Sequence, residues 1–149
     1  MLLRTTTYIF TRMAENQFFL DTSYVLSLEL LNEKHHAEVL AHWQSLDRQT
    51  LEIVTTSYVF DEIVTFFNSR DRHDKAVEVG DRLLNSSIIE LVQVDESLFI
   101  EAWLFFAKHS DKSYSLTDCI SFLVMSKKKI SKALTADRHF VQAGFQRLP

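Results

Sequence analysis

The chain has 149 residues, of which 46% are hydrophobic and 24% charged, and these fractions are ordinary for a soluble globular domain. With only 2 Gly and 1 Pro, it leaves no room for a flexible linker between two domains. The net charge of -4 gives no electrostatic case for a general nucleic-acid binder. A single cysteine, Cys119, excludes an internal disulfide and fits a reducing, cytoplasmic location.

Two further class exclusions concern the membrane and the N-terminus. No apolar run approaches the roughly 18 residues that a membrane span needs. The first 17 residues lack the continuous apolar segment of a signal peptide. We therefore expect an N-terminal arm of unknown role over residues 1–17, followed by one compact domain over residues 18–149.

Short apolar strands alternate with helices along the first half of this domain. Residues 18–20 are predicted to form a buried strand, and the β-branched stretch 51–56 is predicted to form a second. Three helices are expected in this half, over residues 24–31, 35–46 and 58–68. The residues predicted to cap or start them are, in turn, Thr22 or Ser23, Asn32, and Ser57.

The second half continues the same alternation. Helices are expected over residues 74–85, 95–109 and 116–128, with Asp95 as the cap of the second. Strands are expected over residues 87–94, 132–136 and 144–148. Strands that alternate with helices imply right-handed crossovers. The predicted fold is an α/β three-layer sandwich, in which helices flank both faces of a central, mostly parallel sheet.

Four acidic residues are predicted to meet at one edge of that sheet. Asp21 and Asp137 each lie at the end of a predicted strand, while Glu62 and Asp118 lie early in helices that start on the same edge. Clustered carboxylates repel one another, and a divalent cation removes that repulsion. Ligand sets made only of oxygen select Mg²⁺ or Mn²⁺ rather than zinc. The pattern predicts a metal site suited to phosphodiester hydrolysis.

Three of these acids also have a purely structural interpretation. Asp137 is able to begin a turn through hydrogen bonds to nearby backbone amides. Asp118 fits a capping box with Ser115, and capping and metal binding are both open to it. Helical phasing places Glu62, rather than Asp61, on an apolar side, where a partly exposed glutamate is the alternative. The clustering of the acids, and not any single one, favours the metal site.

Four stretches resemble the PIN-domain ribonucleases, and most of all the toxin component of VapBC-type toxin–antitoxin pairs. They are LDTS at 20–23, SYVFDEIV at 57–64, SLTDCISF at 115–122 and LTADRHF at 134–140. The resemblance implies that Mg²⁺ or Mn²⁺ is held, and water positioned on an RNA phosphodiester, by Asp21, Glu62, Asp118 and Asp137. It places small hydroxyl residues beside the acids at Thr22, Ser57 and Thr117. It also implies a homodimer and an antitoxin partner.

The remaining candidate functional residues also have simple structural interpretations. The lysine run 127–129 is available to RNA, but it also fits a solvated helix end that suits the helix dipole. His139 could touch substrate, although a surface turn is the simpler prediction. A non-catalytic PIN-like module that binds RNA or a protein is the main alternative function, and the intact set of four acids argues against it. A phosphatase of the haloacid-dehalogenase type fits poorly, because Ser23 stands where its second acid is needed. A receiver-like domain also fits poorly, because Asp21-Thr22 does not supply paired acids.

Overall fold

The computed structural model describes residues 16–149, so most of the predicted N-terminal arm lies outside the described residues. Five strands form one sheet in the order β3-β2-β1-β4-β5. Every neighbouring pair of strands is parallel. The strands are β1 (Gln17–Leu20), β2 (Glu52–Thr56), β3 (Ile89–Val92), β4 (Lys132–Leu134) and β5 (Gln146–Leu148). The prediction of a central parallel sheet is confirmed.

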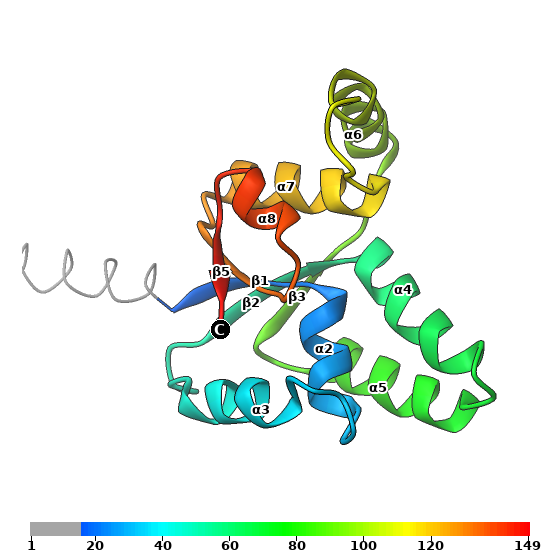
Figure 1. Ribbon diagram of the computed structural model, residues 1–149, viewed down its shortest axis with the longest axis vertical. Helices are drawn as coiled ribbons and strands as arrows, with labels where there is room; N and C mark the ends of the chain where they lie inside the picture. The colour runs from blue at the N-terminus through cyan, green and yellow to red at the C-terminus, as the bar shows by residue number, and fades with distance from the viewer. Residues whose placement is uncertain (1–15) are drawn as a thin grey trace, which may run out of the picture.

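Helices cover both faces of the sheet (Figure 1). On one side lie α2 (Thr22–Glu29), α3 (His36–Ser45), α4 (Ser57–Asn68) and α5 (His73–Asn85). On the other side lie α6 (Glu96–Lys108), α7 (Leu116–Lys128) and α8 (His139–Gln142). This arrangement confirms the three-layer α/β sandwich. None of the helices between residues 16 and 149 combines the length and apolar character that a membrane span needs.

The core forms around the central strand β1 and helix α7. Phe18, Phe19 and Leu20 of β1 are all buried, as expected for a central parallel strand covered on both faces. In α7, seven of thirteen residues are buried, including Cys119, which is fully inaccessible. Helix α7 is therefore the central helix that its apolar sequence predicts, and Cys119 is a core residue.

Helix starts follow the predicted caps in two cases. The Asp95 side chain accepts a hydrogen bond from the Leu98 backbone N–H at the start of α6. At the start of α7, Ser115 and Asp118 form the complete capping box, with each side chain accepting from the other residue's backbone N–H. These motifs are local in sequence, which is why the pattern alone identifies them.

The other predicted caps are wrong. Asp21 is the N-cap residue of α2, which begins at Thr22, so neither Thr22 nor Ser23 precedes the helix. Thr56, not Ser57, caps α4, because Thr56 still has the extended backbone of β2 and its hydroxyl accepts from a backbone N–H in the first turn. Asn32 lies within turns that run to residue 35, and α3 begins only at His36.

Phe140 anchors the short helix α8 to the core. Its side chain is fully buried, and its ring centroid lies 6.1 Å from that of Phe19 in β1 and 5.1 Å from that of Phe122 in α7. A helix of 4 residues gains little from its own hydrogen bonds, so tertiary packing holds it in place. The ring contacts of Phe140 thereby position the loop that carries Asp137.

We expect Phe140→Ala to lower the free energy of unfolding by about 3–5 kcal/mol, because it leaves a cavity between β1 and α7. Urea denaturation followed by far-ultraviolet circular dichroism measures this loss. The matched control is Val141→Ala at the next position, where the side chain is 54% exposed, and its effect should stay within about 0.5 kcal/mol. Similar small effects for both variants would contradict the anchoring role.

Candidate active site

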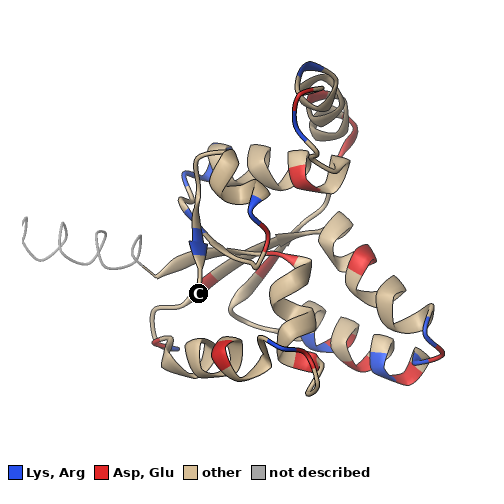
Figure 2. Ribbon diagram, in the orientation of Figure 1, with Lys and Arg blue, Asp and Glu red and all other residues tan. Residues whose placement is uncertain are grey.

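The four predicted acids come from separate segments that converge on the carboxyl edge of the sheet. Asp21 directly follows β1, Asp137 lies in the loop between β4 and α8, Glu62 lies in α4, and Asp118 lies in the first turn of α7. Figure 2 shows acidic segments at the end of β1, on α4 and at the start of α7, around this edge. The charges are close enough to influence one another, because Asp118 and Asp137 both raise the pKa of Glu62.

Asp21 is the most enclosed of the four. The residue is 6% exposed, and its Oδ2 atom accepts hydrogen bonds from Thr135 Oγ1 at 2.7 Å and from Ser23 Oγ at 3.1 Å. Burial raises the pKa of Asp21 to about 6, the charge of Asp118 adds to this rise, and the two hydroxyls oppose it. The hydroxyls therefore fix the carboxylate in place and offset part of the cost of burying it.

Asp118 performs its capping role and still belongs to the acidic cluster. Its Oδ2 atom accepts from the Ser115 backbone N–H at 3.0 Å and lies 3.3 Å from Nδ1 of His139. Burial raises the pKa of Asp118, and the charge of Asp137 raises it further, while the bonds to Ser115 and the nearby His139 lower it. Capping and metal binding are thus compatible at this residue.

Glu62 and Asp61 differ in what their carboxylates contact, although they are neighbours on α4. Thr22 Oγ1 donates to Glu62 Oε1 at 2.7 Å, which ties α4 to the start of α2. Partial desolvation raises the pKa of Glu62, and nearby acids add to the effect. Asp61 instead accepts a hydrogen bond from Thr65 within its own helix. The two neighbours, which helical phasing assigns to different sides of α4, therefore make different contacts: Glu62 with α2, and Asp61 within α4.

Asp137 begins a turn, and it also joins the cluster. Its backbone N–H donates to Thr135 Oγ1 and its Oδ1 atom accepts from the His139 backbone N–H, both at 2.9 Å. The same Thr135 hydroxyl donates to Asp21, so one side chain links the first acid to the last. Ser23 supports this link, because its Oγ atom accepts from the Ala136 backbone N–H at 2.9 Å.

Thr135 and Ser23 were not predicted as site residues. The signal for Thr135 lies in strand pairing, because β1 and β4 are parallel neighbours with Leu20 opposite Leu134. Asp21 and Thr135 are the next residues on each strand, so the register brings their side chains together. A sequence that does not reveal strand order does not reveal this pair.

The predicted supporting residues have different environments. Thr22 contacts Glu62 directly, as described above. Ser57 Oγ accepts from the Val94 backbone N–H at 3.0 Å, so it holds the segment after β3. The carbonyl of Thr117 accepts from Ser121 Oγ at 2.9 Å, within α7. Of the three, Thr22 has the contact that ties it to the cluster.

The donor set fits a divalent cation. Asp118, Asp137 and His139 each offer one ligand atom, and these atoms all lie within 4.8 Å of one another. Burial and mutual repulsion raise the pKa of several of the clustered acids, as expected where carboxylates gather without a counter-ion. Asp21 and Glu62 are not among these three ligands, although the charge of Asp118 acts on both.

The lysine run 127–129 lies away from these acids. It ends α7, and Asp118 begins the same helix, so about 15 Å of helix separates them. Lys127 pairs with Glu101 at 3.0 Å and Lys128 pairs with Glu90 at 2.8 Å. These contacts favour the solvated helix end over a role at the acidic edge.

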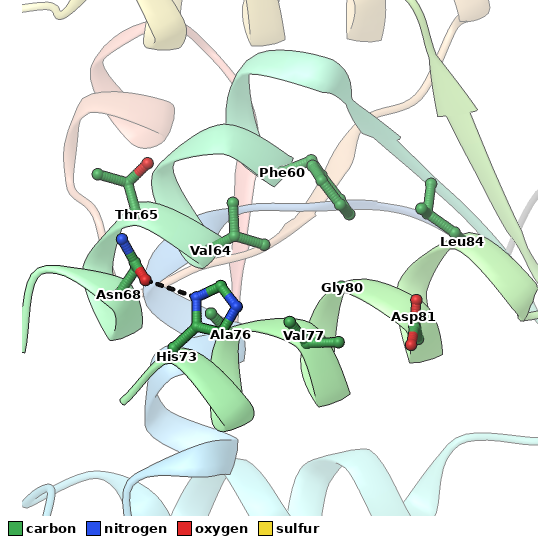
Figure 3. Close-up of a pocket in the computed structure, with 10 residues that line it drawn as sticks. All are labelled: Phe60, Val64, Thr65, Asn68, His73, Ala76, Val77, Gly80, Asp81 and Leu84. Carbon is green, nitrogen blue, oxygen red and sulfur yellow. Dashed lines mark hydrogen bonds between the residues drawn. The ribbon is translucent and has the colours of Figure 1, made fainter. Parts of the chain in front are cut away.

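A pocket of about 410 Å³ lies between α4 and α5 and is not part of this site (Figure 3). Its walls are largely apolar, with Phe60, Val64 and Val77 among the lining residues. At one end, Nδ1 of His73 lies 2.8 Å from the side-chain oxygen of Asn68. None of the four acids lines it, so the pocket and the acidic cluster are separate features.

The all-parallel five-stranded sheet, with helices on both faces, makes this an α/β domain. Its acidic residues lie at the carboxyl edge of the sheet, where proteins with such folds bind ligands. The chain belongs to the PIN-domain family, whose profile matches residues 18–146. It is 32% identical over 127 residues to the 23S rRNA-specific endonuclease VapC20 of Mycobacterium tuberculosis, covering 85% of this chain and 94% of the relative.

Solved structures agree with this assignment. The crystal structure of M. tuberculosis VapC20, described as a sarcin-ricin loop cleaving toxin, superposes with a TM-score of 0.78 at 30% identity, covering 86% of this chain and 95% of the other. FitAcB from Neisseria gonorrhoeae gives a TM-score of 0.64 at 15% identity, over 89% and 96% of the two chains. VapBC-1 from nontypeable Haemophilus influenzae gives 0.59 at 14% identity, over 89% and 96%. The last two share the fold.

We expect Asp21→Asn to stabilise the metal-free protein at neutral pH by about 1–3 kcal/mol. The folded-state pKa of about 6 exceeds the ordinary 3.8, so the folded protein binds this proton more tightly than the unfolded chain. The protonated Asp21 side chain therefore contributes to the free energy of unfolding below about pH 4, and this contribution is lost as the pH rises through about 6. The amide removes the charge and keeps an oxygen for Thr135 and Ser23.

Urea denaturation in EDTA, at neutral pH and near pH 4, measures this effect. The gain should be present at neutral pH and shrink near pH 4, where Asp21 is already protonated. Asp61→Asn is the control, because that acid is exposed on the same edge of the molecule. Destabilisation by Asp21→Asn at neutral pH would contradict the prediction, because it would show that other groups of the protein already compensate the charge of the Asp21 carboxylate.

Proposed function

We propose that this chain is a divalent-metal-dependent endoribonuclease and the toxin of a toxin–antitoxin pair. The observation that carries the proposal is the meeting of Asp21, Glu62, Asp118 and Asp137 at one edge of a PIN fold. A bound Mg²⁺ or Mn²⁺ supplies charge stabilisation at the phosphate and lowers the pKa of water. Similarity to an endonuclease over most of both chains supports the reaction class.

The surroundings of the acids indicate which of them bind the metal and which accepts a proton. Asp21 and Asp118 are buried and held by hydrogen bonds, so they are rigid ligands. Glu62 is exposed and has a raised pKa, and it is held through a single hydroxyl from Thr22. A carboxylate with a raised pKa at the solvent side is suited to accept a proton from the attacking water. We assign that role to Glu62.

Positive charge for an RNA backbone is present beside the acids. Arg138 follows Asp137 directly and is exposed. Arg147 of β5 donates from Nη1 to the Ala136 carbonyl at 3.1 Å, so its guanidinium lies against the same loop. Two arginines at the site make local phosphate binding compatible with the net charge of -4. Because the relative VapC20 is 23S rRNA-specific, we propose ribosomal RNA as the substrate.

The partners are also proposals. We propose an antitoxin, since the relative at 30% identity is a toxin, and a homodimer, as the family resemblance implies. Helix α6 exposes apolar side chains, including Ile100, Trp103 and Leu104, and a protein partner would remove this area from water. A cytoplasmic location follows from the proposed substrate. Light scattering of the purified chain tests the dimer.

We expect Asp118→Asn to reduce RNA cleavage by at least about 100-fold, because it removes a charged ligand from the centre of the cluster. The fold should survive, since the amide oxygen still accepts from the Ser115 backbone N–H. The assay follows purified 23S rRNA and a mixed RNA pool with Mg²⁺, Mn²⁺ or EDTA.

The matched control for this assay is Asp81→Asn, an exposed acid that lines the separate α4–α5 pocket, and it should cut at the wild-type rate. Cleavage by Asp118→Asn, or cleavage in EDTA, would contradict the four-acid mechanism. Folded protein that binds Mn²⁺ but cuts no RNA under any condition would instead favour a non-catalytic PIN-like module.

A further inference from the structure

A ring nitrogen stands among the carboxylates of the proposed metal site. Nδ1 of His139 lies 3.3 Å from Oδ2 of Asp118 and 3.2 Å from Oδ1 of Asp137. This nitrogen is buried, yet it has no hydrogen-bond partner among the described residues 16–149. The atom is therefore at contact distance from two carboxylate oxygens but is aligned with neither.

A buried nitrogen in this state needs a partner. Buried polar atoms are normally paired, and an unpaired one destabilises the fold. Around an octahedral cation with ligands at about 2.1 Å, adjacent ligand atoms are separated by about 3.0 Å. The two measured separations are close to that spacing. A cation bound by Asp118 and Asp137 would therefore place Nδ1 at a neighbouring ligand position.

Contacts within the protein hold this ring in place. The His139 backbone N–H donates to Asp137, which fixes the start of α8 against the loop. The ring of Tyr114 meets the imidazole edge to face, with 5.5 Å between centroids. The next residue, Phe140, is fully buried and anchors α8. Because the backbone bond to Asp137 and the Tyr114 ring constrain the imidazole, Nδ1 is preorganised for binding.

We propose that His139 is a nitrogen ligand of the metal held by Asp118 and Asp137, and that it makes the site prefer Mn²⁺ to Mg²⁺. This inference rests on the metal site of the proposed function and does not depend on which RNA is cut. Imidazole suits transition metals, whereas Mg²⁺ takes oxygen ligands and keeps its waters. With Mg²⁺, a water would therefore occupy the position that Nδ1 fills with Mn²⁺.

The test measures binding of each metal alone, with no RNA present. Isothermal titration should show that His139→Ala weakens Mn²⁺ binding by about tenfold or more, while Mg²⁺ binding changes by less than about threefold. Pulsed electron paramagnetic resonance of the Mn²⁺-loaded wild type should show coupling to a ¹⁴N nucleus. Protein labelled with ¹⁵N-histidine should shift this coupling, and His139→Ala should remove it.

Two further variants keep the test decisive. His139→Asn offers an oxygen near the position of Nδ1, so it should bind Mn²⁺ without the nitrogen coupling, and it serves if the alanine variant fails to fold. His73→Ala is the control, because that histidine contacts Asn68 in the α4–α5 pocket and should leave both metals unaffected.

The outcomes separate this inference from the proposed function. Absence of nitrogen coupling in the wild type, or equal weakening of both metals by His139→Ala, would overturn the ligand role. Nitrogen coupling in a protein that cuts no RNA would uphold the ligand role and overturn the nuclease. RNA cleavage with Mn²⁺ but without nitrogen coupling would uphold the nuclease and overturn the ligand role. If the protein binds neither metal, both the ligand role and the metal-dependent nuclease are overturned.

Discussion

The burial of neighbouring carboxylates at the carboxyl edge of the sheet, to which their mutual repulsion adds, is the constraint on which the site depends. Burial and mutual charge raise the pKa of Asp21, Glu62 and Asp118. The fold tolerates this cost because hydroxyls and backbone amides bind the buried carboxylates, and because a large apolar core surrounds β1 and α7. A divalent cation would relieve the same repulsion, so metal binding and folding stability are linked at this edge.

Structural and functional roles coincide at these residues. Asp118 completes a capping box, and Asp137 begins a turn, as their local sequences predict. The oxygens that make these bonds, Oδ2 of Asp118 and Oδ1 of Asp137, also lie 3.3 Å and 3.2 Å from Nδ1 of His139, so each local role and the cluster share the same atoms. A local interpretation and a site interpretation of one acid are therefore not exclusive. What distinguishes a site residue is the set of side chains that the tertiary fold brings next to it.

The sequence was sufficient for features that depend on short-range pattern. Alternating strands and helices predicted the sandwich, and the helical phase of α4 separated Glu62 from Asp61. The sequence was insufficient where strand order decides the outcome, since Thr135 reaches Asp21 only because β1 and β4 are neighbours in register. Helix starts were missed where a residue remains extended, as Thr56 does.

His139 shows the same limit most clearly. Its place after Asp137 predicts a surface turn, and Asp137 does accept a hydrogen bond from the His139 backbone N–H. The prediction is wrong for His139 itself, which begins α8 and is only partly exposed. The neighbouring Phe140 is drawn into the core, however, and this turns the imidazole toward Asp118 and buries Nδ1. The sequence shows an aromatic residue beside a histidine, but only packing decides which way the histidine faces.

The most direct measurement of the central claim is a crystal structure of the full chain grown with Mn²⁺, with the metal located by its anomalous scattering. The account predicts an anomalous peak at the carboxyl edge of the sheet, within ligand distance of Asp118 and Asp137 and beside Asp21 and Glu62. A well-ordered acidic edge with no peak at millimolar Mn²⁺, or a peak only elsewhere on the molecule, would contradict it.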